Sequence, residues 1–540
     1  MSQNIKKVFN NIYSKNNALY EMTSKGEVWI SRDCGISSIY ENIDTGDIKA
    51  NLYFDTPFGR RTQSVERHEY LTTSNLAKLQ NKGLDVMPKN IVKVLEHLRN
   101  EEDRAPRVYR HSTIGFGKYD GKLIYKLDKC IGIDSKYDGQ LDLEPKGSKE
   151  EWLDMFKNEV LGQIPLELII VISLSAVLTG FIGEENGLDT TIVHLSGNSS
   201  TGKSTALKLA TSLFGYPDVK NNGLFSTFNT TQNAMMNRLT GIVGVPVSFD
   251  EISMSQNIRF TSMVYQLANG EEKKRLTGEI EQRQSQSWLT TIMTNGEKSL
   301  CESTSNYAGV KVRVFEFELN QWTKDANNAQ NINKVILNNY GHIGYKFAKY
   351  IMNKGKDYVQ QKYEKNKKIM HKNLRKRRIV DQYTARRVNK LGLFLATAEI
   401  FEEMIDINLN RKKIAKLLLD LERESINNRN LDKSIIDYLS EYITANKSKF
   451  KIRNDNNVIS NNKIDIIGRI TYKDEFTEVE ILESKFKAII EEGGFKDSRV
   501  LLKELKKQGL LDAEGDRHYR KRKLNTDIPV KVNVIRLPKK

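Results

Sequence analysis

The sequence predicts a multidomain α/β protein, and two observations support this fold class. The chain has 540 residues, whereas a single hydrophobic core stops growing at about 250–300 residues, so several domains are expected. Helical and strand patterns alternate over residues 152–319, as they do in α/β domains. The apolar fraction of 39% and the charged fraction of 28% are those of an ordinary folded chain, which excludes a fibrous or wholly disordered protein.

Four segments are expected along the chain. Residues 1–150 mix short alternating apolar runs with one helical stretch, which predicts an α+β domain without a chemical motif. A polar passage at residues 138–151 marks the next boundary. Residues 151–330 form the α/β segment, residues 331–415 have helical patterns, and residues 416–540 end in the order helix, helix, hairpin, strand.

The positive charge is concentrated. The formal net charge is +17, and residues 354–378 hold eleven basic and two acidic residues, while residues 503–540 hold twelve basic and five acidic ones. Such clusters are typical of phosphate contacts, so a nucleic acid is the expected partner, and a solvated surface is the alternative. For residues 354–378 the sequence leaves DNA, a neighbouring subunit and solvent equally open.

Cysteine usage and hydropathy indicate a reducing, cytoplasmic compartment. Cys34, Cys130 and Cys301 are far apart, which argues against a disulfide framework or a cysteine zinc site. Residues 168–183 are uncharged for sixteen residues, fewer than the ~20 that span a membrane, and acidic residues flank them. We therefore expect a buried core helix and no membrane partner, and the first residues lack the apolar core of a signal peptide.

A glycine-rich segment gives the strongest local signal. Gly197, four further residues and then Gly202-Lys203-Ser204 satisfy the P-loop pattern, between an apolar run at 190–195 and a helical pattern at 205–214. Backbone N–H groups of such a loop bind phosphates, the lysine reaches the β- and γ-phosphates, and the serine ligates magnesium. ATP and Mg²⁺ are thus the expected ligands. The candidate nucleotide-binding residues are Gly197, Asn198, Ser199, Ser200, Thr201, Gly202, Lys203, Ser204 and Thr205.

An acidic pair follows the apolar run at residues 243–249. Asp250 is expected to hold the magnesium ion through water, together with Ser204, and Glu251 to polarise the attacking water. Pro246 is awkward inside a central strand and predicts an irregular or edge segment there.

Two further strands end the α/β pattern. Residues 287–295 end in Asn295, whose amide can orient the same water, and residues 310–319 carry Arg313, which can stabilise transition-state charge in an adjacent subunit. Each residue alone is more often structural than functional. Their order after the P-loop and the acidic pair makes them candidate catalytic residues.

This layout of P-loop, acidic strand, Asn-ended strand, arginine and helical lid resembles the AAA+ ATPases. The segments LSGNSSTGKST, VSFDEIS, LANGEEKKR, TIMTNGE and GVKVRVFEF are similar to those of the MCM-like helicases of staphylococcal cassette chromosome elements, over residues 105–405. The resemblance implies an AAA+ core with a helical lid, a homo-hexameric ring, a sensor 1 role for Asn295 and an arginine-finger role for Arg313. It places sensor 2 on Arg386 or Arg387, of which Arg387 is preferred.

The resemblance also implies a pore hairpin between the acidic strand and the Asn-ended strand. Lys273, Lys274 and Arg275 lie there and would track a DNA single strand, unless the segment is a solvated turn. The C-terminal order of elements is that of a winged helix, which binds duplex DNA or mediates protein contacts. Its candidate phosphate contacts are Arg517, Arg520, Lys521, Arg522 and Lys523.

The function expected from these features is a ring-forming, ATP-dependent DNA helicase or translocase that replicates a mobile genetic element. The alternatives are an ATP-controlled initiator or loader bound to DNA, and a motor that remodels duplex DNA without unwinding it. Replication proteins of the element or of its host are further expected partners.

Overall fold

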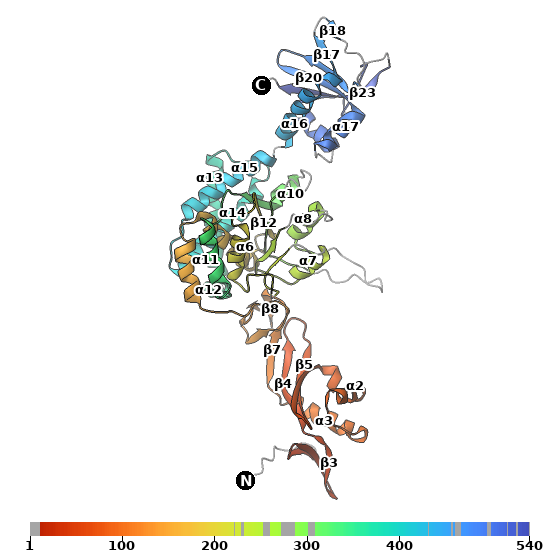
Figure 1. Cartoon of the computed structure of the whole chain (residues 1–540), viewed down its shortest axis with the longest axis vertical. Coiled ribbons are helices and arrows are strands. Elements are labelled where there is room, and N and C mark those ends of the chain that lie inside the picture. The colour runs from red at the N-terminus through yellow and green to blue at the C-terminus, as the bar shows by residue number, and fades with distance from the viewer. Residues whose placement is uncertain are drawn as a thin grey trace.

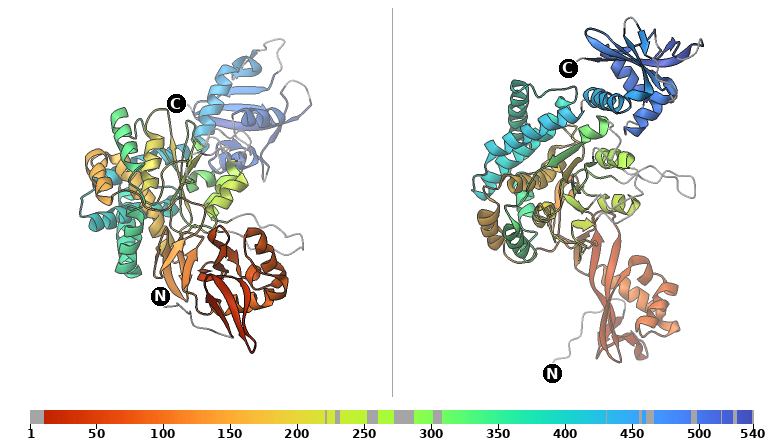
Figure 2. Two further views of the ribbon diagram at one scale, coloured as in Figure 1. Left: turned by 60° about the horizontal axis from the view of Figure 1, so that its bottom comes forward. Right: turned by 45° about the horizontal axis from the view of Figure 1, so that its top comes forward.

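The computed structural model describes residues 11–220, 222–227, 232–251, 260–271, 287–300, 308–429, 431–454, 457–459, 466–493, 498–515, 517–524 and 528–538. The buried apolar side chains of these residues form three clusters in chain order, which define an N-terminal, a central and a C-terminal unit. The units follow one another along the longest axis of the molecule, with the chain termini at opposite ends (Figure 1). Figure 2 shows the same three bodies from two further directions.

The N-terminal unit packs helices against one face of a five-stranded sheet of order β11-β7-β4-β5-β6, beside a three-stranded sheet of order β1-β2-β3. Strand β5 shows the sequence pattern that turns one face of this sheet toward the core. Ala50, Leu52 and Phe54 are buried at alternate positions, which is the period expected of a half-buried strand. The elements are β1 (Ile12–Lys15), β2 (Ala18–Thr23), β3 (Gly26–Arg32), β4 (Cys34–Asn42), β5 (Ile48–Thr56), β6 (Gly59–Glu66), β7 (Arg107–His111), β11 (Ser135–Tyr137), α1 (Arg67–Tyr70), α2 (Thr73–Lys78), the 3₁₀ turns Leu79–Lys82 and Pro88–Asn90, and α3 (Ile91–Glu102).

A small three-stranded sheet joins this unit to the centre. It consists of β8 (Gly115–Tyr119), β9 (Lys122–Lys126) and β10 (Cys130–Ile131). Phe116 and Tyr125 belong to the central core, with ring centroids 4.7 Å apart, and the Tyr125 hydroxyl donates to the Gly244 carbonyl at 3.2 Å. The central core therefore begins near Ile114 and not at the predicted boundary of residue 150.

The central unit is built on a five-stranded parallel sheet of order β13-β14-β15-β12-β16. Its strands are β12 (Thr191–Ser196), β13 (Phe225–Thr227), β14 (Val247–Asp250), β15 (Thr291–Asn295) and β16 (Val314–Glu318). Because all strands are parallel, their carboxyl ends meet at one edge of the sheet, where ligands bind in open α/β folds. The P-loop follows β12 at this edge.

Helices surround the sheet and share one hydrophobic core with it, so the predicted lid is not a separate core. They are α4 (Lys149–Met155), the π-helical turn Phe156–Val160, α5 (Ile164–Ile182), α6 (Lys203–Ser212), α7 (Gln232–Leu239), α8 (Phe260–Asn269), α10 (Ala308–Arg313), α11 (Ala326–Ile336), α12 (Ile343–Lys354), α13 (Lys356–Lys376), α14 (Thr384–Ile405) and α15 (Arg411–Arg429). In all views α13 lies on the opposite side of the unit from α7 and α8 (Figures 1 and 2).

Helix α5 is apolar on every face. Its mean hydropathy of 2.1 and its 19 residues would suffice to cross a membrane, but 83% of its most apolar window is buried inside the protein. It packs against α6, α12, α13, α14 and α15. This arrangement agrees with the expected core helix, because a helix that is hydrophobic all round has to be buried on all sides.

The C-terminal unit is a seven-stranded sheet covered by helices. Its elements are α16 (Leu431–Ala445), the 3₁₀ turn Lys447–Lys449, β17 (Phe450–Asn454), β18 (Asn457–Ile459), β19 (Gly468–Tyr472), β20 (Phe476–Leu482), α17 (Glu483–Glu492), α18 (Ser498–Lys507), β21 (Leu511–Asp512), β22 (Arg520–Arg522) and β23 (Val530–Pro538). The two predicted helices and the last strand are present. The predicted hairpin around Gly515 is wrong, because β21 and β22 each pair with β23 and not with each other.

Two predicted strands of the central sheet are shorter than expected. Strand β14 begins at Val247, so Pro246 lies before it, which explains how a proline is tolerated in that segment. Residues 308–313 are helical, so Arg313 ends α10 and the strand that follows begins at Val314. The alternating apolar and polar residues of VKVRVFEFEL predict a strand over the whole segment, because valine is common in strands. The helical turn at its start therefore has no signal in the sequence.

Candidate functional site

The P-loop turns sharply between β12 and α6. Gly197, Ser200 and Gly202 have φ values of 121°, 62° and 86°, all in the left-handed region. A Cβ atom on Gly202 would lie 2.4 Å from the Thr323 hydroxyl oxygen, so only glycine fits there. These conformations bring the loop backbone round to the N-terminus of α6, where free N–H groups and the helix dipole favour an anion.

Lys203 is buried at the start of α6. Its ammonium group donates to the carbonyl oxygens of Gly197 at 2.8 Å and Asn198 at 2.5 Å, so the side chain folds back across the loop. Burial lowers the pKa of Lys203, and the nearby carboxylates of Glu251, Glu297 and Asp250 oppose that shift. The lysine is therefore positioned at the point where the loop would hold phosphate oxygens.

Three polar side chains from three different elements meet beside the lysine. The Ser204 hydroxyl donates to Asp250 Oδ1 at 2.9 Å, and Asn295 Nδ2 donates to the same oxygen at 2.7 Å and to Ser204 Oγ at 3.1 Å. Ser204 lies in the first turn of α6, Asp250 ends β14 and Asn295 ends β15. Parallel pairing of β12 with β15, and of β15 with β14, brings these three chain segments to one edge.

The residues present fit a magnesium ion. Mg²⁺ prefers octahedral oxygen ligands at about 2.0–2.1 Å, which puts adjacent ligand oxygens about 2.9 Å apart. Ser204 Oγ and Asp250 Oδ1 are separated by 2.9 Å, a spacing at which Asp250 would bind the ion directly and not through water as expected from the sequence. Among the described residues no group of three or more His, Cys, Asp and Glu side chains could hold a metal, so phosphate and water would supply the remaining ligands.

Glu251 follows Asp250 in a left-handed conformation, with φ of 57°. Its backbone N–H donates to Asn295 Oδ1 at 2.7 Å, so the Asn295 amide fixes both acidic residues at once. Glu251 lines a cavity of about 430 Å³ above the P-loop. The other lining residues are Ser199, Ser200, Thr201, Gly202, Lys203, Ser204, Thr205, Asn295, Glu297, Gln321, Thr323, Asp325, Ala326 and Ala329.

Sequence reasoning missed the far wall of this cavity. Gln321, Thr323 and Asp325 come from the loop between β16 and α11, and Glu297 comes from the loop after β15. Glu297 follows Asn295 by two residues and could have been suggested from that spacing. The other three carry no pattern in the sequence, because parallel pairing of β12 with β16 alone brings their loop to the P-loop.

Arg313 lies at the opposite edge of the sheet from its own P-loop. It directly precedes β16, whose first residue pairs with Ile192 near the start of β12, whereas the P-loop follows the end of β12. The guanidinium lies over the Tyr265 ring, 4.6 Å from its centroid, and donates to the Gly309 carbonyl at 3.0 Å. Burial lowers the pKa of Arg313, and the positive charge of Arg386 lowers it further.

The two candidate sensor 2 arginines, both in α14, have different surroundings, and neither lines the P-loop cavity. Arg386 is half exposed and pairs with Asp189, just before β12 and close to Arg313. Arg387 is 3% exposed and donates to Glu422 at 2.6 Å and to the Val314 carbonyl at 3.0 Å, over the Phe315 ring. The preferred residue, Arg387, thus joins α14 to α15 and β16 inside the protein.

The predicted DNA contacts are only partly described. Lys273, Lys274 and Arg275 lie outside the described residues, and the flanking Glu271 and Ser287 form an antiparallel bridge. In the C-terminal unit Arg520 pairs with Asp512 at 2.6 Å and Glu514 at 3.1 Å. Arg522 lies 3.5 Å from Glu480, whereas Arg517, Lys521 and Lys523 are exposed.

The comparisons with known proteins agree with this organisation. A family model described as a domain of unknown function (DUF927) matches residues 8–287, and a model described as the Cch helix turn helix domain matches residues 430–540. A solved structure titled "SCCmec type IV Cch - active helicase" is similar at 25% sequence identity, with a TM-score of 0.79 over 98% of each chain. No curated protein matches the chain. Because the first model covers just over half of the 540 residues, the protein belongs to the DUF927 family.

Proposed function

We propose that this protein is an ATP-dependent DNA helicase of a mobile genetic element. The observation that carries the proposal is the meeting of Lys203, Ser204, Asp250 and Asn295 at the carboxyl edge of a parallel sheet. This set supplies a phosphate contact, two magnesium ligands and a γ-phosphate sensor. A solved structure titled as an active helicase shares the fold over 98% of both chains, and the C-terminal unit matches a helix-turn-helix model.

The nucleotide would bind with its phosphates against the P-loop. Backbone N–H groups of residues 197–205 would hold the phosphate oxygens, and Lys203 would leave its carbonyl partners to contact the β- and γ-phosphates. Magnesium held by Ser204 and Asp250 would neutralise charge on the β- and γ-oxygens. Glu251 would accept the proton of the attacking water. The Asn295 amide would hold the Glu251 backbone and the Asp250 carboxylate in place.

The catalytic arginine would come from a neighbouring subunit of a ring. Arg313 is on the sheet edge opposite its own P-loop, so a head-to-tail contact between subunits would bring it to the next subunit's γ-phosphate. Arg386 lies close to Arg313 and is half exposed, whereas Arg387 is committed to Glu422. We therefore assign the sensor 2 role to Arg386 in place of Arg387, acting on the same neighbour.

The proposed DNA contacts come from two segments of the chain, one between α8 and β15 and one in the C-terminal unit. The segment between Glu271 and Ser287, with Lys273, Lys274 and Arg275, would contact one strand in the ring pore. In the C-terminal unit Arg517, Lys521 and Lys523 would contact duplex phosphates, because their side chains are exposed to solvent.

Strand release from a forked duplex tests the proposal. The full-length protein with ATP and Mg²⁺ should release the labelled strand, and Lys203→Ala should not, because the variant loses its phosphate contact. Lys334→Ala, an exposed lysine outside the cavity, is the matched control and should remain active. DNA-stimulated ATP hydrolysis without strand release would refute the helicase proposal and identify a loader or a duplex motor.

A further inference from the structure

Helix α13 carries most of the basic run at residues 354–378, and its two halves differ. In the first half each lysine has a partner: Lys356 pairs with Glu185, Lys362 with Glu399 and Glu403, and Lys365 with Glu399. These lysines hold the helix in place. Their charge is already balanced within the fold.

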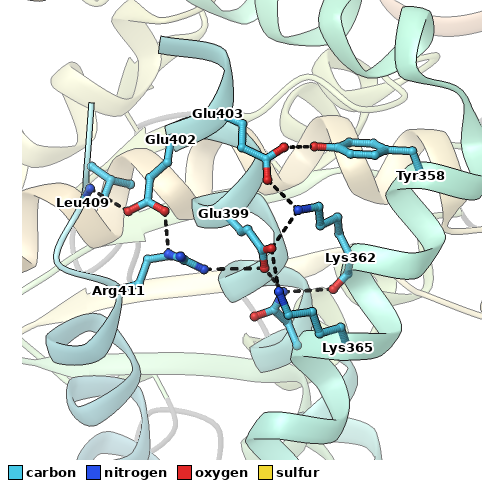
Figure 3. Close-up of polar contacts among 9 residues, drawn as sticks. Tyr358, Lys362, Lys365, Glu399, Glu402, Glu403, Leu409 and Arg411 are labelled. Atoms are coloured by element: carbon cyan, nitrogen blue, oxygen red, sulfur yellow. Dashed lines mark hydrogen bonds and ion pairs between the residues drawn. The ribbon is translucent and has the colours of Figure 1, made fainter. Parts of the chain in front are cut away.

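Figure 3 shows how firmly this half is anchored. Glu399 of α14 accepts from Lys362 and from Lys365, each at 2.8 Å, and its side chain is 7% exposed. Arg411 of α15 joins the same carboxylate at 3.5 Å and Glu402 at 2.5 Å. Three helices are thereby locked together, so the outer face of α13 is a rigid surface.

In the second half Lys367 pairs with Glu364, whereas four other basic residues have no acidic partner in the part of the chain that the structure describes. Lys368, Lys372, Arg375 and Lys376 are exposed, and no acidic residue pairs with any of them among the described residues. At 3.6 residues per turn these four side chains fall within about 100° of the helix circumference, along about 12 Å of its axis. Tyr363, Met370 and Leu374 face the core from the opposite side. We call these four residues the α13 basic stripe.

Like charges spaced by three or four residues destabilise a helix. Lys372 has one such neighbour before it, Lys368, and two after it, Arg375 and Lys376. The acidic residue one turn before Lys368, Glu364, pairs with Lys367. An external polyanion would remove that cost. A second copy of this chain is poorly suited to do so, because the longest acidic run in the sequence is the three residues Glu101–Glu102–Asp103, and Glu102 pairs with Arg67.

We propose that the α13 basic stripe binds the phosphodiester backbone of DNA, at a site separate from the pore. The inference rests on the proposed function, because that function supplies DNA as the polyanion. Helix α8 leads into the segment predicted to enter the pore, and α13 is on the opposite side of the central unit (Figure 1). DNA bound there lies on the outer surface of the lid, and charge pairing without base contacts makes this binding independent of sequence.

Equilibrium binding of the full-length protein to a labelled forked DNA tests the proposal. The variant is the triple substitution Lys368→Ala, Lys372→Ala and Lys376→Ala, which preserves the helix because alanine has the highest helix propensity. The matched control removes the same charge at three exposed lysines far from the stripe: Lys25→Ala, Lys89→Ala and Lys122→Ala. A second variant replaces the three stripe lysines with arginine and keeps the charge.

The stripe variant should bind more weakly, and the slope of log affinity against log salt should become shallower by about 2–3, since each phosphate contact contributes about 0.9. The control and the arginine variant should bind as the parent does. Equal loss in the stripe variant and the control would overturn the proposal, as would unchanged binding by the stripe variant. If the stripe variant loses DNA affinity only because its oligomeric mass changes, which light scattering would measure, the proposal is overturned and the stripe is a subunit contact.

The two proposals fail in different ways. A parent protein that binds DNA through the stripe but releases no strand refutes the helicase and leaves the stripe intact. A parent protein that unwinds DNA while the stripe variant binds DNA equally well refutes only the stripe. A parent protein that binds no DNA refutes both.

Discussion

The carboxamide nitrogen of Asn295 lies 2.7 Å from the carboxylate of Asp250, which joins the end of β15 to the end of β14. The oxygen of the same carboxamide accepts from the backbone N–H of Glu251 at 2.7 Å. One neutral side chain therefore sets the positions of Asp250, which we propose as a magnesium ligand, and of Glu251, which we propose as the base. A neutral amide suits this place, because its nitrogen donates to Asp250 and its oxygen accepts from the Glu251 N–H, whereas a carboxylate there would repel Asp250.

Replacing Asn295 by alanine should therefore reduce catalysis more than binding. The phosphate contacts of the P-loop remain, whereas Asp250 and Glu251 lose their common partner, so kcat should fall by about 10²–10³, as when one preorganised donor is removed. Steady-state kinetics should show a much smaller change in KM for ATP. Asn338→Ala, in an exposed helical turn, is the control. An unchanged kcat would show that Asn295 serves only the fold.

Replacing Glu251 by glutamine should give a protein that binds ATP and hydrolyses it slowly. Glutamine keeps the size of the side chain but cannot accept the proton of water, and general bases contribute about 10²–10⁴ in rate. Nucleotide binding and single-turnover hydrolysis measure the two effects separately. Glu297→Gln changes a carboxylate that lines the same cavity and should retain most activity. Hydrolysis at the parent rate in Glu251→Gln would show that another group activates water.

Arg313→Ala should lose about 10³-fold or more in kcat, the scale of an arginine that stabilises phosphoryl transfer. If Arg313 acts on the neighbouring subunit, mixing this variant with Lys203→Ala should restore part of the activity, because some interfaces then combine an intact P-loop with an intact arginine. Lys203→Ala mixed with Glu251→Gln is the control and should stay inactive, since both defects lie on the P-loop side. Failure of the first mixture to recover would argue for action within one subunit.

Tyr265 should affect catalysis by positioning Arg313. The guanidinium lies over the Tyr265 ring at 4.6 Å, and a contact of this kind is worth about 0.5–2 kcal/mol. Tyr265→Leu should lower kcat with little change in KM, while Tyr265→Phe keeps the aromatic face and should stay close to the parent. Each variant should also be mixed with Lys203→Ala. Equal kcat in the two mixtures would show that the Tyr265 ring has no role in positioning Arg313.

The Glu399 network should make stability depend on pH in the acidic range. Its ion pairs lower the pKa of Glu399 from 4.5 to about 2 against the opposing effect of burial, so its contribution is complete above pH 4.5 and is lost as the pH falls toward 2. Glu399→Gln should destabilise the protein by about 1–3 kcal/mol at pH 7. Urea unfolding followed by tryptophan fluorescence should show this difference shrinking between pH 5 and pH 3. A pH-independent difference would contradict the assignment.

The sequence predicted the carboxyl edge of the sheet well and the rest of the site poorly. The P-loop, Asp250 and Asn295 follow apolar strands directly, so parallel pairing alone brings them together. The position of Thr323 depends on where a loop after β16 returns, which no periodicity encodes. The resemblance places the sensor 2 role on Arg386 or Arg387 with a preference for Arg387, and only the packed structure shows that Glu422 covers Arg387.

The C-terminal unit illustrates a different difficulty. Its strands β17 to β20 mix apolar with polar residues, and the sequence predicts only helices, a hairpin and a last strand for residues 416–540. These strands are stabilised by pairing across the sheet and by a few buried residues such as Ile470, Val479 and Ile481. Strand preference depends on such neighbours more than on the strand's own residues.

The burial of α5 has a consequence for synthesis of the chain. Its covering helix α14 begins at Thr384, about 200 residues after α5 ends at Ile182. At about 5–20 residues per second, α5 leaves the ribosome about 10–40 s before this partner exists. Throughout that interval a helix with the length and hydropathy of a membrane span is without its main cover. The core of the central unit is therefore complete only after α14 has been made.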